Sequence, residues 1–275
     1  TTTTIDFSVF NCLKEITGNF QIENNNALET ISEFTNLKTV GKFFGIGFNA
    51  ALTSISGFAK LETVGGNNIV ETLAFSIKNN DLLKTIEGFN RITTLHGNFE
   101  INGNSELEKI KGFEELTTID GNFNINNNDK LETIEGFEEL TTLDGNFYIG
   151  FNPVLTTNPE FGSLETVSGE LNIVRNDKLI TISGFGSLTE VSEFFLIDNN
   201  AALTIISGFA VLTGVGGDFG ISLNDALTII SGFESLETVG GFLEIKNNGN
   251  NNTPNEDVIT TITGFGNFTI TNGII

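Results

Sequence analysis

The sequence predicts an all-β repeat protein, a right-handed parallel β-solenoid of about eleven 24-residue coils. A fixed period of this length is typical of a solenoid, in which each coil buries its apolar face only by stacking on its neighbours. Repeat positions are numbered 1 to 24, with Gly112 at position 1. The clearest marker is a phenylalanine at position 2, which recurs every 24 residues apart from intervals of 31 and 32, at Phe10, Phe34, Phe58, Phe89, Phe113, Phe137, Phe161, Phe185, Phe209, Phe233 and Phe265.

Positions 12 to 14 of the repeat predict a short strand. Position 12 is Phe in eight copies and Leu in two, at Leu171 and Leu243. Position 14 is isoleucine in all ten complete copies. Side chains two residues apart lie on the same face of a strand, so this F-x-I pattern indicates a strand with one buried face. Positions 5, 8, 20 and 23 are almost always Leu, Ile or Val. Each coil should therefore point about seven apolar side chains inward, each contributing roughly 1.5–3 kcal/mol.

Position 17 predicts a structural ladder of asparagine side chains. An amide carries both donors and an acceptor, so stacked amides spaced one strand apart can bond to the corner backbone and to one another. A ligand-binding role is less well supported, because partner sites vary between repeats and this position does not. The ladder comprises Asn25, Asn49, Asn80, Asn104, Asn128, Asn152, Asn176, Asn200, Asn224 and Asn248.

The period also sets the expected domain organisation. Residues 1–8 should form an N-terminal linker or edge strand, residues 9–265 the β-solenoid repeat domain, and residues 266–275 a C-terminal cap or edge strand. Three irregularities interrupt the repeat: an insertion around residues 66–72, the Asn158-Pro159 pair, and a polar insertion around residues 249–256. We expect a bulge at the first and loops at the other two, because proline is poorly tolerated inside a sheet and the last segment is rich in turn formers.

The repeat resembles a known family. The string L-x-x-I-x-G-x-F-x-I-x-x-N-x-x-L-x-x-I-x-x-F, read from Leu116 to Phe137, resembles the leucine-rich repeat. It is more similar to the repeat of receptor L-domains and of related cell-surface proteins. The resemblance covers roughly residues 9 to 265. It implies a leucine-rich-repeat-like solenoid and leaves the ligand open, because such folds carry many ligands.

Composition narrows the class of partner. A formal net charge of −22 and a pI near 4.2 argue against nucleic acid and anionic membranes. The sequence contains no run of about 18 apolar residues, so it predicts no membrane span. Cys12 is the single cysteine and cannot form an internal disulfide. The chain has no methionine, so we expect a processed or excised chain, with any signal peptide or anchor outside it. The expected location is extracellular, at the cell surface.

One row of side chains could carry chemistry. His96 is the only histidine, and it shares position 9 with Asp120 and Asp144 of the next two coils. Stacked about 5 Å apart, these three side chains could form a single-metal site or an acid/base pair. We favour the alternative, in which His96 relieves repulsion within a solvated charge row. No cofactor, metal or catalytic residue is therefore predicted.

The outward positions 11, 13 and 15 of the F-x-I strand are the predicted partner-binding surface. They vary between coils while their inward neighbours do not. Several apolar residues on one parallel face could form a recognition surface. The candidates are Phe43, Tyr148, Val174, Phe194, Leu196 and Phe242.

The sequence thus predicts a non-enzymatic extracellular recognition or adhesion module that binds a protein or glycan through its sheet face. An alternative is a structural subunit that assembles end to end into a surface filament or layer, because an open sheet edge invites another chain. A third interpretation, a polysaccharide-acting enzyme with carboxylates at Asp120 and Asp144, is disfavoured because the repeat is regular through that region.

Overall fold

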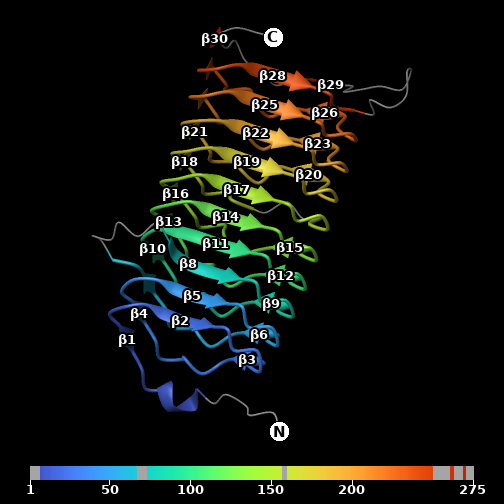
Figure 1. The fold of residues 1–275 in the computed structure, drawn as a ribbon. Coiled ribbons are helices and arrows are strands. Elements are labelled where there is room, and N and C mark those ends of the chain that lie inside the picture. The colour runs from blue at the N-terminus through green and yellow to red at the C-terminus, as the bar shows by residue number, and fades with distance from the viewer. Residues whose placement is uncertain (1–6, 67–72, 157–159, 250–260, 263–268, 271–275) are drawn as a thin grey trace.

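The protein is a stack of parallel β-coils (Figure 1). The computed structural model describes residues 7–66, 73–156, 160–249, 261–262 and 269–270. Each coil contributes up to three short strands, and each strand pairs in parallel with its counterpart in the neighbouring coils. The prediction of an all-β parallel solenoid is confirmed.

The strands of the first sheet lie at repeat positions 7 and 8, and the sheet has 11 strands. In spatial order they are β1 (Glu15–Ile16), β4 (Thr39–Val40), β7 (Thr63–Val64), β10 (Thr94–Leu95), β13 (Thr118–Ile119), β16 (Thr142–Leu143), β18 (Thr166–Val167), β21 (Glu190–Val191), β24 (Gly214–Val215), β27 (Thr238–Val239) and β30 (Thr269–Ile270).

The strands of the second sheet are longer and contain the F-x-I pattern; this is the ten-stranded sheet. It comprises β2 (Phe20–Glu23), β5 (Phe44–Gly47), β8 (Leu73–Lys78), β11 (Asn98–Asn102), β14 (Phe123–Asn126), β17 (Phe147–Gly150), β19 (Leu171–Val174), β22 (Phe195–Asp198), β25 (Phe219–Ser222) and β28 (Leu243–Lys246).

The third side of the stack, at positions 22 and 23, consists of a five-stranded and a four-stranded sheet. The five-stranded sheet comprises β3 (Thr30–Ile31), β6 (Ser54–Ile55), β9 (Thr85–Ile86), β12 (Lys109–Ile110) and β15 (Thr133–Ile134). The four-stranded sheet comprises β20 (Thr181–Ile182), β23 (Ile205–Ile206), β26 (Ile229–Ile230) and β29 (Thr261–Ile262).

The number of turns is slightly smaller than the eleven coils expected. About nine turns contain all three strands among the described residues. The coil of β16 and β17 has no third strand there, and the last coil is represented by β30 alone. The expected loops at Asn158-Pro159 and in the polar insertion lie outside the described residues, apart from Gly249. Most of the first insertion does too, although the β8–β11 register shifts by one residue beside it.

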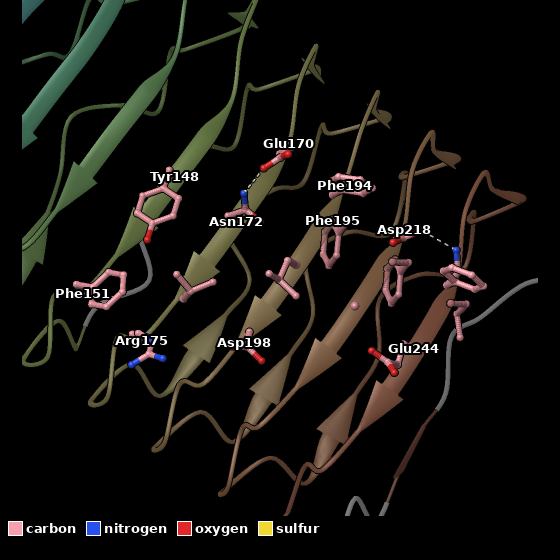
Figure 2. A pocket seen from close by; sticks show the side chains of 16 residues that line it. Tyr148, Phe151, Glu170, Asn172, Arg175, Phe194, Phe195, Asp198, Asp218 and Glu244 are labelled. Atoms are coloured by element: carbon pink, nitrogen blue, oxygen red, sulfur yellow. Dashed lines mark hydrogen bonds between the residues drawn. The ribbon is translucent and has the colours of Figure 1, made fainter. Parts of the chain in front are cut away.

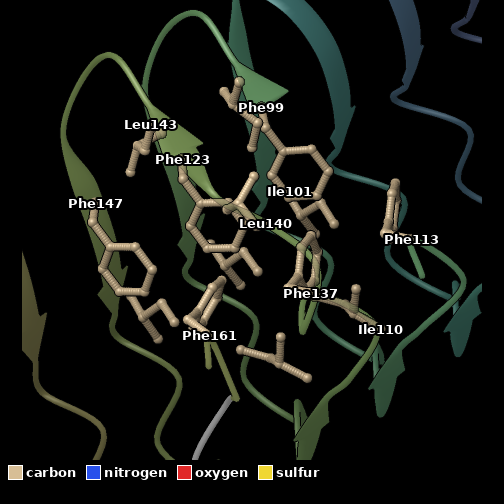
Figure 3. Packing of buried hydrophobic residues seen from close by; sticks show 14 of the residues in the cluster. Phe99, Ile101, Ile110, Phe113, Phe123, Phe137, Leu140, Leu143, Phe147 and Phe161 are labelled. Atoms are coloured by element: carbon tan, nitrogen blue, oxygen red, sulfur yellow. The ribbon is translucent and has the colours of Figure 1, made fainter. Parts of the chain in front are cut away.

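The core is built from two stacks of phenylalanine rings, at positions 2 and 12 (Figure 3). Within the position-12 stack, Phe99 and Phe123 lie parallel with ring centroids 5.1 Å apart. Across the two stacks, Phe123 meets Phe137 edge to face at 5.1 Å. Offset-parallel and edge-to-face contacts are the favourable aromatic arrangements. In the inner coils the predicted inward residues are buried, including Leu116 and Ile125 with no exposed area. In the end coils they are less protected: Phe10 is 44% exposed, and Leu243 and Ile245 are only partly buried.

Two local features define the ends and corners of the stack. At the N-terminal end lies a short 3-10 helix, η1 (Ser8–Phe10), which overlaps the segment expected as a linker or edge strand only at Ser8. The ring of Phe10 stacks on Phe34 with centroids 5.9 Å apart. At position 1, Gly112 has a φ of +93°, and an added Cβ would lie 2.9 Å from the backbone nitrogen of Gly88. Glycine adopts this φ without strain, whereas Glu33 and Glu160, at position 1 of two other coils, do not have a positive φ.

Candidate functional site

The outward face of the ten-stranded sheet is hollowed over strands β17, β19, β22, β25 and β28 (Figure 2). We call this hollow the aromatic groove; its volume is about 620 Å³. Its apolar lining comes from Tyr148, Phe151, Val174, Phe194, Leu196, Phe242 and Leu243. Phe195 and Phe219 also border it, although both are fully buried and belong to the core. The polar lining of the groove comes from Glu170, Asn172, Arg175, Asp198, Asp218 and Glu244, and Gly220 completes it.

Glycines make room for the large side chains of the aromatic groove. A Cβ added at Gly150 would lie 2.7 Å from the hydroxyl oxygen of Tyr148, and one at Gly217 would lie 2.7 Å from Cδ1 of Phe194. A Cβ added at Gly220 would lie 3.0 Å from Cδ1 of Leu196. The missing side chains therefore let these three residues lie against the sheet.

Four carboxylates and one guanidinium line the aromatic groove. Oε2 of Glu170 accepts a hydrogen bond from Nδ2 of Asn172 at 2.8 Å. Oδ1 of Asp198 accepts one from the hydroxyl of Ser222 at 2.5 Å. Glu244 forms an ion pair with Lys246, with Nζ and Oε1 2.6 Å apart. The groove thus combines an apolar surface with an excess of negative charge.

Asp218 takes the place of an amide that recurs along the sheet. In coils with asparagine at position 11, its Oδ1 accepts a hydrogen bond from the position-11 N–H of the next coil; one example joins Asn122 to the N–H of Asn146 at 2.7 Å. Oδ1 of Asp218 accepts the N–H of Phe242 in the same way, at 2.8 Å (Figure 2). An asparagine would make this bond equally well, so the negative charge of Asp218 is not needed for it.

The corner at position 16 forms one edge of the aromatic groove. The guanidinium of Arg175 lies over the ring of Phe151, 5.2 Å from its centroid, which is a cation–π contact. Both residues have a positive φ, 55° for Phe151 and 54° for Arg175.

Nearby, partial burial raises the pKa of the Tyr148 hydroxyl above its ordinary value of 10.0, with Arg175 acting in the opposite direction. The Tyr148 hydroxyl is therefore protonated at neutral pH and can donate a hydrogen bond.

The structure brings five of the six predicted partner-binding residues together in the aromatic groove. Phe194 and Phe242 are the most exposed of them, at 45% and 44%. Tyr148 and Leu196 are half-buried. Val174 lines the groove but is only 9% exposed. Phe43 lies apart, ahead of β5 near the other end of the sheet, with its ring against Gly45.

The predicted charge row is brought together only in part. Nδ1 of His96 lies 2.6 Å from Oδ2 of Asp120. Among the described residues, no side-chain hydrogen bond or ion pair joins Asp144 to them, and no group of three His, Cys, Asp or Glu residues is arranged to hold a metal. The arrangement is that of an exposed histidine–carboxylate pair.

The position-17 asparagines form a continuous ladder. Nδ2 of Asn128 donates to Oδ1 of Asn152 at 3.3 Å and to the carbonyl of Ile101 in the preceding coil at 3.2 Å. The N–H of Asn128 donates to the same Oδ1 of Asn152 at 3.2 Å. Eight members of the ladder, from Asn49 to Asn224, have no exposed area; Asn248 retains 9%, and Asn25 is partly exposed at the other end.

Phe151 and Arg175 were not predicted as site residues, because they occupy position 16 and not the outward positions 11, 13 and 15. A signal for them was present. Position 16 is Asn or Gly in six coils, as a left-handed corner prefers, and is Phe, Arg or Leu in the other four: Phe48, Phe151, Arg175 and Leu223.

Comparison with known proteins agrees with the repeat pattern. Residues 11–92 match the family model of the Receptor L domain. This part of the chain is receptor L-domain-like. The resemblance noted from the repeat string is thereby confirmed for these residues.

Two other comparisons add little. The chain is similar to the crystal structure of the pneumococcal vaccine antigen PcpA, with 13% identity over 98% of this chain and 86% of that chain. The TM-score is 0.27, so this likeness carries no argument about fold or function. None of the curated proteins matches the sequence. Among the described residues, no helix has the length and apolar character needed to cross a membrane.

Proposed function

We propose that this chain is a non-enzymatic extracellular recognition or adhesion module that binds a protein or glycan through the aromatic groove. The observation that carries the proposal is the groove itself, in which exposed aromatic rings lie beside carboxylates on a rigid sheet. Recognition surfaces concentrate binding energy in such aromatic anchors surrounded by polar groups. The receptor L-domain match of residues 11–92 supports a binding role and a cell-surface location.

The test is a double substitution in the groove, Phe194→Ser with Leu196→Ser. Binding would be measured on arrays of immobilised glycans and secreted proteins, and stability by thermal melting. We expect binding to weaken at least about tenfold with melting nearly unchanged, because both side chains lie on the outward face. A melting decrease of many degrees would place these side chains in the core and contradict the proposal.

A matched control uses two apolar residues away from the groove. Ile180 and Val211 are 50% and 39% exposed and do not line the groove. Ile180→Ser with Val211→Ser should leave binding unchanged. If this control weakened binding as much as the groove variant does, general surface hydrophobicity would be responsible.

End-to-end assembly into a filament or layer remains a second candidate. The observation that favours it is that the end strands of the ten-stranded sheet, β2 and β28, each pair on one side only within the described residues. Unpaired strand edges are templates for another chain. Electron microscopy and light scattering of the purified protein test this candidate; particles that stay monomeric across a wide concentration range would rule it out.

A further inference from the structure

We infer that the aromatic groove binds a short extended segment of a partner protein in which basic side chains alternate with apolar ones. This inference rests on the proposed recognition function and narrows it to one class of ligand. The length of the groove, its charge and its apolar floor support this inference.

The length of the aromatic groove suits a short peptide. It extends across five neighbouring strands, from β17 to β28. Strands in a sheet lie about 4.8 Å apart, so the groove is roughly 19 Å long. An extended chain advances about 3.3 Å per residue, which corresponds to about six residues.

The charge of the aromatic groove suits a basic ligand. Glu170, Asp198, Asp218 and Glu244 line it, against a single Arg175. Lys246 partly neutralises Glu244, and Arg175 is held over Phe151. Asp198 and Asp218, like Glu170, have no ion-pair partner among the described residues, so their charges are available to a cation. Their backbone and hydroxyl partners need only an oxygen acceptor, so an uncharged asparagine would satisfy the fold equally well.

The apolar part of the aromatic groove suits aliphatic or aromatic ligand side chains. Leu196 lies over Gly220 in its middle, and the exposed rings of Phe194 and Phe242 come from the coils on either side of Gly220. Apolar side chains spaced two residues apart along an extended peptide share one face. Such a ligand can direct its apolar side chains into the groove, while its basic side chains, which leave the opposite face, have stems long and flexible enough to bend back to the carboxylates at the groove's sides.

These features favour a basic peptide over a glycan. An anionic glycan would be repelled by the carboxylates and by the overall charge of −22. A neutral glycan could donate hydroxyl hydrogen bonds to Asp198 and Asp218, but it carries no positive charge to match theirs. A basic peptide gains from both the charge and the apolar floor.

The test measures fluorescence anisotropy of labelled hexapeptides with the whole chain. The probes are alternating arginine and leucine, alternating arginine and glycine, and alternating glutamate and leucine. We expect the arginine–leucine peptide to bind at least about tenfold more tightly than the arginine–glycine peptide, and the glutamate–leucine peptide not to bind. The affinity of the arginine–leucine peptide should decrease as NaCl is raised from about 0.1 to about 1 M, because the Debye length shrinks from about 10 to about 3 Å.

Isosteric variants separate the groove charges from the overall charge. Asp198→Asn with Asp218→Asn should lower affinity for the arginine–leucine peptide about tenfold while leaving melting unchanged. The matched control, Glu115→Gln with Glu139→Gln, removes the same charge from two exposed residues outside the groove and should have little effect. Equal losses from the two pairs would overturn the inference, as would equal affinity for the arginine–leucine and arginine–glycine peptides.

A glycan probe separates this inference from the proposed function. If chitohexaose bound, Phe194→Ser abolished that binding, and the arginine–leucine peptide did not bind, the ligand class would be wrong and the recognition function would stand. If the arginine–leucine peptide bound and Phe194→Ser with Leu196→Ser left its affinity unchanged, the aromatic groove would not be the binding site and both would fail.

Discussion

At the scale of single residues, the corner at position 16 has a positive φ in all ten copies. Asparagine and glycine adopt this conformation readily, whereas other residues pay roughly 1–2 kcal/mol because Cβ crowds the following carbonyl. Phe48, Phe151, Arg175 and Leu223 carry this cost. Strained positions of this kind tend to occur at binding sites, and two of the four line the aromatic groove.

Phe151→Asn should therefore stabilise the fold and impair binding. We expect the free energy of unfolding to rise by about 1 kcal/mol, because the left-handed strain is relieved and Phe151 is already 41% exposed. Binding through the groove should weaken, because one of its aromatic rings is lost. Denaturant melts and the binding arrays measure the two effects.

The control for Phe151→Asn is Phe48→Asn, which relieves the same strain at a corner outside the groove. Phe48 has a φ of 56° and is 44% exposed. The Phe48→Asn variant should show a similar rise in the free energy of unfolding, with no change in binding. A loss of stability in both variants would show that ring packing outweighs backbone strain at these corners.

The asparagine ladder gives a second prediction at this scale. Asn128→Ala should lower the free energy of unfolding by about 1–3 kcal/mol, because its buried partners, including the carbonyl of Ile101, lose their hydrogen bonds. Asn126→Ala on the outward face should be nearly neutral. Equal effects of the two substitutions in denaturant melts would contradict a structural role for the ladder.

At the scale of one coil, the position-1 corner at Gly112 depends on glycine. Gly112→Ala should lower the free energy of unfolding by about 1–3 kcal/mol, because φ is +93° and the new Cβ would meet the backbone of Gly88 at 2.9 Å. Gly162→Ala is the control, since a Cβ there would meet nothing within 4 Å. Similar melting temperatures for the two variants would show that the corner can shift to admit a methyl group.

Most of each coil could be predicted from the sequence because its determinants are local and repeated. The F-x-I alternation fixes which side chains of β14, for example, are buried, since a strand has only two faces. The left-handed corner could not be read from a single coil with Phe151 or Arg175, because neither residue signals that conformation. It becomes visible only when position 16 is compared across all copies.

The aromatic groove was harder to predict than the coil that carries it. Its candidates Phe194, Leu196 and Phe242 follow from outward positions, but its shape depends on contacts between coils. Gly217 and Gly220 create the space that Phe194 and Leu196 fill. Phe43 looked equivalent in the sequence and lies outside the groove, because equal repeat positions can be many coils apart.

At the scale of the whole molecule, the net charge of −22 predicts a dependence on salt. Raising NaCl should raise the melting temperature, because counterions screen the mutual repulsion of the carboxylates. Calcium chloride at the same ionic strength should raise the melting temperature no more than NaCl does. Millimolar calcium or zinc should have no specific effect on it. A metal-specific rise that Asp120→Asn abolished would reveal a site at His96 and Asp120, since a bound ligand stabilises the folded state.

The asparagine ladder also gives the stack a direction. Every described bond between neighbouring ladder side chains runs the same way, from a donor nitrogen in one coil to Oδ1 in the next, beginning with Asn25 to Asn49 and ending with Asn224 to Asn248. The row therefore ends with the acceptor oxygen of Asn25 at one end and the donor hydrogens of Asn248 at the other. A second copy could prolong this row only head to tail, so any fibre built by continuing the ladder would be polar, with two chemically distinct tips.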